Sequence, residues 1–103
     1  MISLFYVTAP DLKTAQTLGK NAVENKLAAC ANIFPIMQSI YHWGDSVETS
    51  EEAVLILKAP KDHFEALEKW LHENHPYDVP CLIELPAGKV STPYLSWLND
   101  SLK

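Results

Sequence analysis

The chain lacks arginine altogether and contains little glycine or cysteine. All eight basic residues are lysines, against 13 acidic residues, and the net charge is −5. An acidic chain repels phosphate backbones, and without arginine it has no planar, bidentate group to hold guanine or a phosphoryl group. Its three glycines form no phosphate-binding loop. We therefore expect neither nucleic-acid binding nor an acylphosphatase-like enzyme.

Only two cysteines are present, Cys30 and Cys81. An iron–sulfur cluster needs four suitably spaced thiolates, so a ferredoxin-type cluster is excluded. The two cysteines do not form a C-x-x-C pattern, and we expect both to be buried, unreactive thiols rather than redox groups. Free thiols are typical of the reducing cytoplasm, which is the location we expect.

Long apolar runs are absent as well. No run approaches the roughly 20 residues that a membrane span needs. The first residues, Met1 to Phe5, lack the basic region of a secretory signal and have the character of a strand. We therefore expect no membrane partner.

What the chain does contain is typical of a single globular domain over residues 1–103. It is 48% hydrophobic and 20% charged, an ordinary balance for a folded chain. Three tryptophans, four tyrosines and three phenylalanines are a large aromatic content for the modest core of so short a chain. Part of this apolar surface is therefore expected to meet another subunit.

Local patterns predict four strands and three helices. β-Branched and aromatic runs indicate the strands, apolar residues at helical spacing indicate the helices, and Gly44-Asp45 marks a turn. Pro35 indicates a bulge or an edge position in its strand. In chain order the predicted elements are strand 2–8, helix 11–26, strand 29–43, strand 47–58, helix 60–74, strand 81–85 and helix 93–102.

This order predicts an α+β fold of the ferredoxin-like type. The pattern βαββαβ gives an antiparallel sheet with two helices on one side, and here an extra C-terminal helix follows. The other side of the sheet is left uncovered. Large exposed apolar patches are rare on monomers, so self-association is expected to cover that side.

Six short segments are spread in order over nearly the whole chain: Thr8-Ala9-Pro10-Asp11, Lys26-Leu27-Ala28-Ala29-Cys30-Ala31-Asn32, Ser39-Ile40-Tyr41-His42-Trp43, Leu55-Ile56-Leu57-Lys58, His75-Pro76-Tyr77-Asp78-Val79-Pro80 and Tyr94-Leu95-Ser96-Trp97-Leu98. Together they resemble the CutA divalent-cation tolerance proteins. The resemblance implies a ferredoxin-like subunit in a compact homotrimer, similar in fold and assembly to the PII signalling proteins. It also implies a role in copper tolerance without enzymatic activity.

The resemblance also implies where copper would bind in this chain. Family members described as copper binders use a cysteine late in the first strand and two adjacent histidines before a Pro-Tyr pair. The corresponding residues here are Val7, Asn74 and His75. Valine cannot ligate a metal and asparagine is a poor copper ligand, so only His75 matches.

A second metal hypothesis comes from the spacing of His72 and His75. Two imidazoles three residues apart can share one face at a helix end, and Glu68 lies one turn earlier. Such a site would bind Cu(II) or another divalent cation weakly, and no cofactor is required. The alternative is that both histidines are solvated at a helix C-terminus. His42 and His63 have no partner at a diagnostic spacing and are expected to be structural or exposed.

Aromatic and charged residues supply the remaining candidates. They line a small-molecule cleft between subunits, or they pack in the trimer interface and with the C-terminal helix. The function expected is thus a trimeric metal-response protein that binds a divalent metal or an unidentified small ligand. The alternative is a structural or PII-like signalling module that docks a protein partner. The candidates are Tyr41, Trp43, Tyr77, Tyr94, Trp97 and Lys58, with Glu51 and Glu52 as charges that pair across subunits, border a polar cleft or remain solvated.

Overall fold

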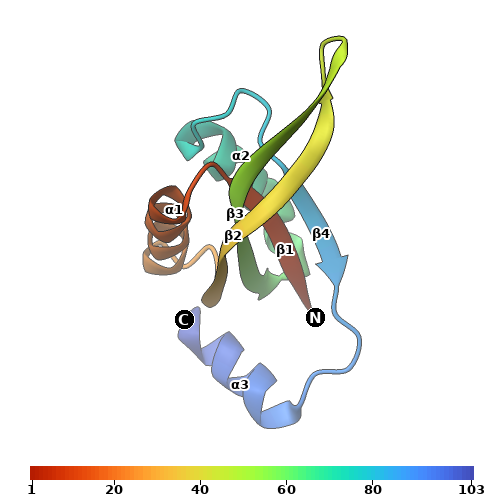
Figure 1. Cartoon of the computed structure of the whole chain (residues 1–103). Coiled ribbons are helices and arrows are strands. Elements are labelled where there is room, and N and C mark those ends of the chain that lie inside the picture. The colour runs from red at the N-terminus through yellow and green to blue at the C-terminus, as the bar shows by residue number, and fades with distance from the viewer.

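The computed structural model describes residues 1–103 and has the expected α+β fold. Its four strands form one antiparallel sheet in the order β2-β3-β1-β4, and three α-helices accompany it (Figure 1). The elements are β1 (Ile2–Ala9), α1 (Leu12–Glu24), β2 (Cys30–Trp43), β3 (Ser46–Pro60), a 3-10 turn η1 (Lys61–His63), α2 (Phe64–Asn74), β4 (Leu82–Pro86) and α3 (Thr92–Ser101).

Helix α1 is shorter than the sequence pattern predicts, and local chemistry fixes both of its ends. The Thr14 backbone N–H donates to Oδ1 of Asp11 at 2.7 Å, so Asp11 is the N-cap and lies outside the helix. At the other end Lys26 has a positive φ of 60°, a conformation that a helix does not continue through. The helix therefore ends at Glu24, two residues before the predicted end.

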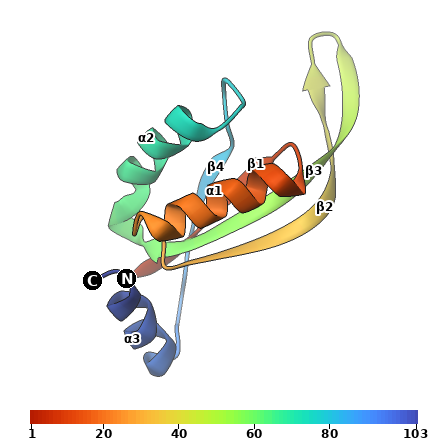
Figure 2. The same ribbon diagram turned by 90° about the vertical axis from the view of Figure 1, so that its left-hand side faces the viewer.

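Helices α1 and α2 cover one face of the sheet (Figure 2). The core between these layers contains inward-facing residues of β1 and β3, such as Phe5 and Leu55, packed against residues such as Leu67 of α2. Successive side chains of a strand point to opposite faces of the sheet, so Phe5 and Leu55 face the helices while the residues next to them in each strand face the other side. The split-βαβ architecture predicted from the sequence is thus present.

The opposite side of the sheet, called here the open face, carries Tyr6, Ile56 and Ile83 in neighbouring strands. The sequence predicts that this face is bare, and this expectation is wrong at one end. There α3 lies beside the start of β1 (Figure 1), and Leu98 packs with Ile2 in a second small core. The rest of the face stays exposed: Phe34 is 58% exposed and Ile83 51%.

Strands β2 and β3 extend beyond the sheet as a hairpin, called here the arm (residues 37–52; Figures 1 and 2). Its turn contains Gly44, whose φ of 63° favours glycine. The predicted irregularity at Pro35 is confirmed, because the register shifts between Phe34 and Met37. The arm exposes large apolar side chains, among them Ile40 at 70% and Trp43 at 73%. Such exposure is unusual on a monomer.

The molecule is elongated as a result, with extents of 47 × 26 × 23 Å. None of its helices has the length and apolar character that a membrane crossing requires.

Candidate functional site

A hollow of about 660 Å³ lies at the end of the open face remote from α3. Strand register explains how it forms. Tyr41 pairs with Glu48 and Met37 with Glu52, so these side chains share one face of the arm. The segment that leads into β4 closes the opposite wall. The lining residues are Thr8, Tyr41, Trp43, Glu48, Glu52, Tyr77, Asp78, Val79 and Cys81.

Tyr77 connects the two walls of the hollow. Its hydroxyl donates a hydrogen bond of 2.9 Å to Oε2 of Glu52. Burial, acting together with the hydrogen bond to Glu52 and the negative charge of Glu52, raises the pKa of Tyr77 to about 12. The phenol therefore remains a neutral donor at physiological pH.

Cys81 lies in the same hollow as a half-buried free thiol. Burial raises its pKa, and the charge of Glu52 adds to this, while hydrogen bonding with Thr8 acts in the opposite direction. A raised pKa keeps the thiol protonated and poorly nucleophilic. This agrees with the expectation of an unreactive thiol, but the expected full burial is wrong, because Cys30 and Cys81 are both only half-buried.

His75 is 8% exposed and uses both ring nitrogens within the chain. Nε2 lies 2.7 Å from the Thr8 carbonyl oxygen, which can only accept, so Nε2–H is the donor. Nδ1 accepts from the backbone N–H of Tyr77 at 3.0 Å. The ring also contacts the Tyr77 ring, with centroids 4.7 Å apart. This histidine holds the end of β1 against the segment after α2.

The predicted metal sites do not match this geometry. Helix α2 ends at Asn74, and His75 has an extended backbone, so His72 and His75 do not share a helix face. His72 is exposed, whereas His75 has no free nitrogen. In the trio implied for copper, Val7 is fully buried and Asn74 donates its amide to the Trp70 carbonyl at 2.8 Å. These residues do not fit a copper ion.

The aromatic candidates separate into two groups. Tyr41, Trp43 and Tyr77 line the hollow. The Tyr41 and Trp43 rings meet edge to face with centroids 6.4 Å apart, and the Tyr41 hydroxyl donates to Ser50 at 3.2 Å.

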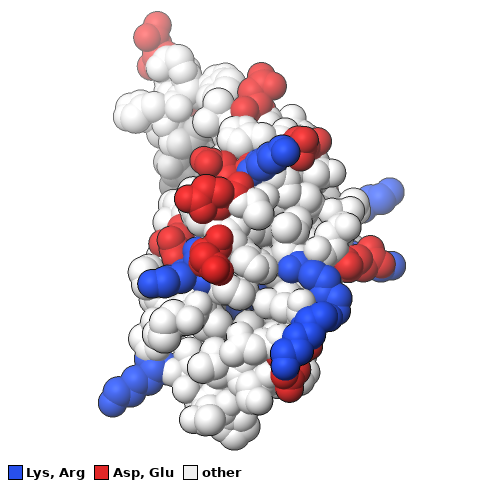
Figure 3. Space-filling view, turned by 180° about the vertical axis from the view of Figure 1, so that it is seen from behind, with Lys and Arg blue, Asp and Glu red and all other residues white.

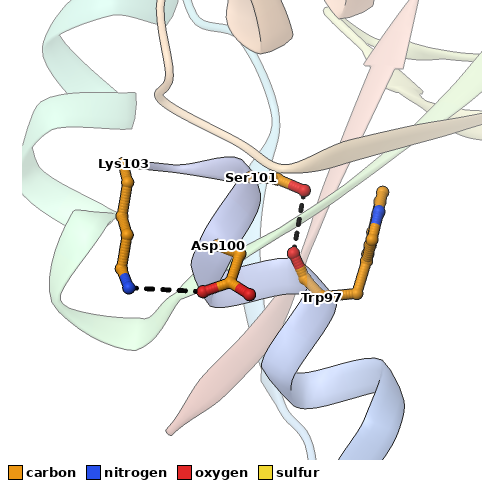
Figure 4. Close-up of polar contacts among 4 residues, drawn as sticks. All are labelled: Trp97, Asp100, Ser101 and Lys103. Carbon is orange, nitrogen blue, oxygen red and sulfur yellow. Dashed lines mark hydrogen bonds and ion pairs between the residues drawn. The ribbon is translucent and has the colours of Figure 1, made fainter.

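The second group lies at α3, away from the hollow. Lys58 Nζ donates to the Tyr94 hydroxyl at 3.2 Å and lies 5.3 Å from the centroid of that ring. The Tyr94 and Trp97 rings are 5.5 Å apart. In Figure 4 the Trp97 side chain points away from the ion pair of Asp100 and Lys103, which are 3.3 Å apart, while Ser101 donates to the Trp97 carbonyl at 2.8 Å. The contact between Lys58 of β3 and Tyr94 joins α3 to the open face.

Several residues of the hollow were not singled out as site candidates from the sequence. Glu48 could have been found, because the turn at Gly44 fixes the register that places it opposite Tyr41. Thr8, Asp78 and Cys81 meet the arm only through tertiary folding, and their sequence positions carry no signal for it.

Seen from behind, acidic side chains predominate in the upper half of the molecule and lysines lie mostly below (Figure 3).

Comparison with protein families gives one clear match. Residues 3–101 fit the family model of the CutA1 divalent ion tolerance proteins. A protein of Escherichia coli named divalent-cation tolerance protein CutA is 45% identical over 96 residues, which cover 93% of this chain and 86% of that protein.

Solved structures of the same family superpose over almost the full chain. CutA1 of Oryza sativa is 38% identical with a TM-score of 0.94, covering 97% of this chain and 92% of that one. The protein of Archaeoglobus fulgidus, described as a periplasmic divalent cation tolerance protein CutA, is 30% identical with a TM-score of 0.95 and full coverage of both chains. The fold, its extra helix and its arm are therefore shared with these proteins.

Proposed function

This chain belongs to the CutA1 family of divalent ion tolerance proteins, and from that premise we propose that it serves divalent-cation tolerance as a homotrimeric, non-enzymatic binding protein. The hollow beside Tyr77 and Glu52 is the binding site. It lies on the open face, so assembly through that face makes it a cleft between subunits.

The exposed apolar surface of the open face and the arm is the observation that supports assembly. Phe34 and Ile83 lie on the open face, while Ile40 and Val47 project from the far side of the arm. Burial of such side chains contributes roughly 25 cal/mol per Å². The threefold symmetry is the one that the family resemblance implies.

A binding role rather than catalysis is supported by the chemistry of the hollow. Its one thiol has a raised pKa, and the phenol of Tyr77 is held as a hydrogen-bond donor to Glu52. Neither is an activated nucleophile, because that requires a lowered pKa or a positioned base. Three aromatic rings and three carboxylates remain, which is a set of binding groups.

A complementation assay tests this function. A host strain without the gene is exposed to Cu(II) and supplied with the wild-type chain, Glu52→Gln or Glu51→Gln. Glu51 lies on the opposite face of the same strand and does not line the hollow, so it is the matched control. The wild type and Glu51→Gln should restore growth and Glu52→Gln should not. Equal growth with all three would contradict the role of the hollow.

We also propose that the protein works in the cytoplasm. Cys30 and Cys81 are both free thiols, a state that a reducing compartment maintains. The Archaeoglobus fulgidus relative is described as periplasmic, so the proposal needs a direct test. Fractionation of cells should recover the chain with cytoplasmic markers, and recovery with periplasmic markers would contradict it.

A further inference from the structure

We propose that the hollow binds a small aliphatic amine, an alkylammonium ion or short diamine, rather than a bare metal ion. This inference rests on the proposed function and deepens it, because it assigns a ligand class to the same site. Four observations carry it: the aromatic walls, the unpaired carboxylates, the electrostatic effect of Glu52 and the spread of the acidic groups.

The aromatic walls suit the carbon chain and the charge of an amine. Tyr41, Trp43 and Tyr77 come from the arm and from the segment before β4, on opposite sides of the hollow. Trp43 is 73% exposed in the single chain, and its ring meets Tyr41 edge to face rather than stacked, so aromatic surface is left for a ligand. Methylene groups pack on such rings, and the negative face of an aromatic ring attracts an ammonium group.

The acidic residues of the hollow carry charge that the chain does not neutralise. Glu48, Glu52 and Asp78 line it, and no lysine does. The only ion pair of the chain joins Lys103 to Asp100. Three negative charges therefore face a cavity with no internal counter-ion, and a cationic ligand supplies one.

The effect of Glu52 on its neighbours is consistent with this negative potential. It raises the pKa of Tyr77 and of Cys81, in each case after the larger effect of burial. Its Oε2 accepts the Tyr77 hydroxyl, which orients the carboxylate and leaves Oε1 as an acceptor. A carboxylate oxygen without a partner, such as Oε1 of Glu52, can accept a hydrogen bond from a ligand. An amine with N–H groups therefore matches the site better than a quaternary ammonium ion, which has none.

The spread of the carboxylates distinguishes an amine from a metal ion. No three His, Cys, Asp or Glu side chains come together in a group that could hold a metal ion. Ca²⁺ and Mg²⁺ require six or more oxygens at about 2.0–2.6 Å from one centre. The acidic groups instead line a hollow of about 660 Å³, in which the two ammonium groups of a diamine can each meet a different carboxylate.

Calorimetric titration of the assembled protein with 1,4-diaminobutane tests the inference. Saturable binding is expected with diaminobutane, and none with 1,4-butanediol, which has the same carbon chain without charge. Glu52→Gln should weaken binding about tenfold, equivalent to about 1.4 kcal/mol. Glu51→Gln, on the other face of β3, should leave binding unchanged.

Two further titrations separate the alternatives. Tetramethylammonium should bind more weakly than diaminobutane, because it has charge but no N–H donors, and equal or tighter binding would overturn the amine assignment. Mg²⁺ should not compete with diaminobutane at constant ionic strength, and competition would indicate a metal site instead. Absence of saturable binding by diaminobutane, or equal binding by Glu52→Gln and Glu51→Gln, would also overturn the inference.

The outcome is separable from that of the proposed function. Circular dichroism and sedimentation of Glu52→Gln confirm that the variant is folded and assembled before it is titrated. If diaminobutane fails to bind while the complementation assay still requires Glu52, the ligand class is wrong and the site stands. If Glu52 is dispensable in both assays, the site itself is wrong.

Discussion

The hydroxyl of Tyr77 donates a 2.9 Å hydrogen bond to Oε2 of Glu52, joining the segment before β4 to the base of the arm. The two residues lie 25 positions apart in the chain, and the hollow lies between the elements that carry them. The same contact keeps the phenol protonated and one carboxylate oxygen oriented. The pair therefore contributes to local stability and shapes the proposed binding site.

Removal of the Tyr77 hydroxyl should make stability less dependent on alkaline pH. The pKa of Tyr77 is about 12 in the fold against an ordinary value of 10.0, so its contribution is fully present below pH 10 and is lost as pH rises towards 12. Tyr77→Phe should be less stable by about 1 kcal/mol at neutral pH. Urea unfolding between pH 7 and pH 12 should show that the difference in free energy of unfolding between the wild type and Tyr77→Phe becomes smaller as pH rises. A difference that stays constant with pH would contradict a stabilising role of the hydrogen bond between Tyr77 and Glu52.

His75→Ala should reduce stability without changing copper binding. The substitution leaves the Thr8 carbonyl and the Tyr77 N–H without the partner they have in the fold, which costs about 1–3 kcal/mol per buried group. Calorimetry with Cu(II) should give the same result for wild type and variant. His72→Ala is the control, because it removes an imidazole that is exposed. Loss of copper binding in His75→Ala but not in His72→Ala would support the metal hypothesis again.

Leu98→Ala should release α3 from the open face. Leu98 is fully buried in the small core that contains Ile2 and Ala29, and truncation of a buried leucine costs about 2–5 kcal/mol. Amide hydrogen exchange should show α3 losing protection while α1 keeps it. The exposed Leu12→Ala serves as a comparison. Uniform loss of protection through the chain would show that α3 is not a separate unit.

Gly19→Val should destabilise the packing of α1 on the sheet. A Cβ at Gly19 would lie 3.1 Å from the Cβ of Ala31 and from Cδ1 of Leu55, so a larger side chain forces α1 away from the sheet. Overpacking of this kind costs about 1–3 kcal/mol. Thermal unfolding measures the effect. Gly88→Val is the control, because that glycine has open space around it, and equal losses would refute the packing explanation.

The strands and helices could be predicted from the sequence because their signals are local. The apolar alternation of β1 and the glycine at the arm turn are examples, and Pro35 marked the register shift. The ends of α1 were misplaced because the pattern does not show the Asp11 cap or the left-handed Lys26.

The candidate site could be predicted only in part, because it depends on tertiary contacts. The aromatic residues were identified either as cleft residues or as packing residues, but the sequence did not show which interpretation applies to each: those of the arm line the hollow, whereas Tyr94 and Trp97 pack at α3. His75 was interpreted as a ligand because histidine spacing is visible in a sequence. Its two hydrogen-bond partners, Thr8 and Tyr77, become visible only in the fold.

Sedimentation equilibrium of the purified chain at decreasing concentration tests the central claim most directly, namely that copies of this chain cover the open face. We predict a single particle three times the 11.6 kDa chain mass. In Ile83→Glu, which places a charge on the exposed apolar surface, the particle should dissociate. A folded, stable wild-type monomer of 11.6 kDa would contradict the claim.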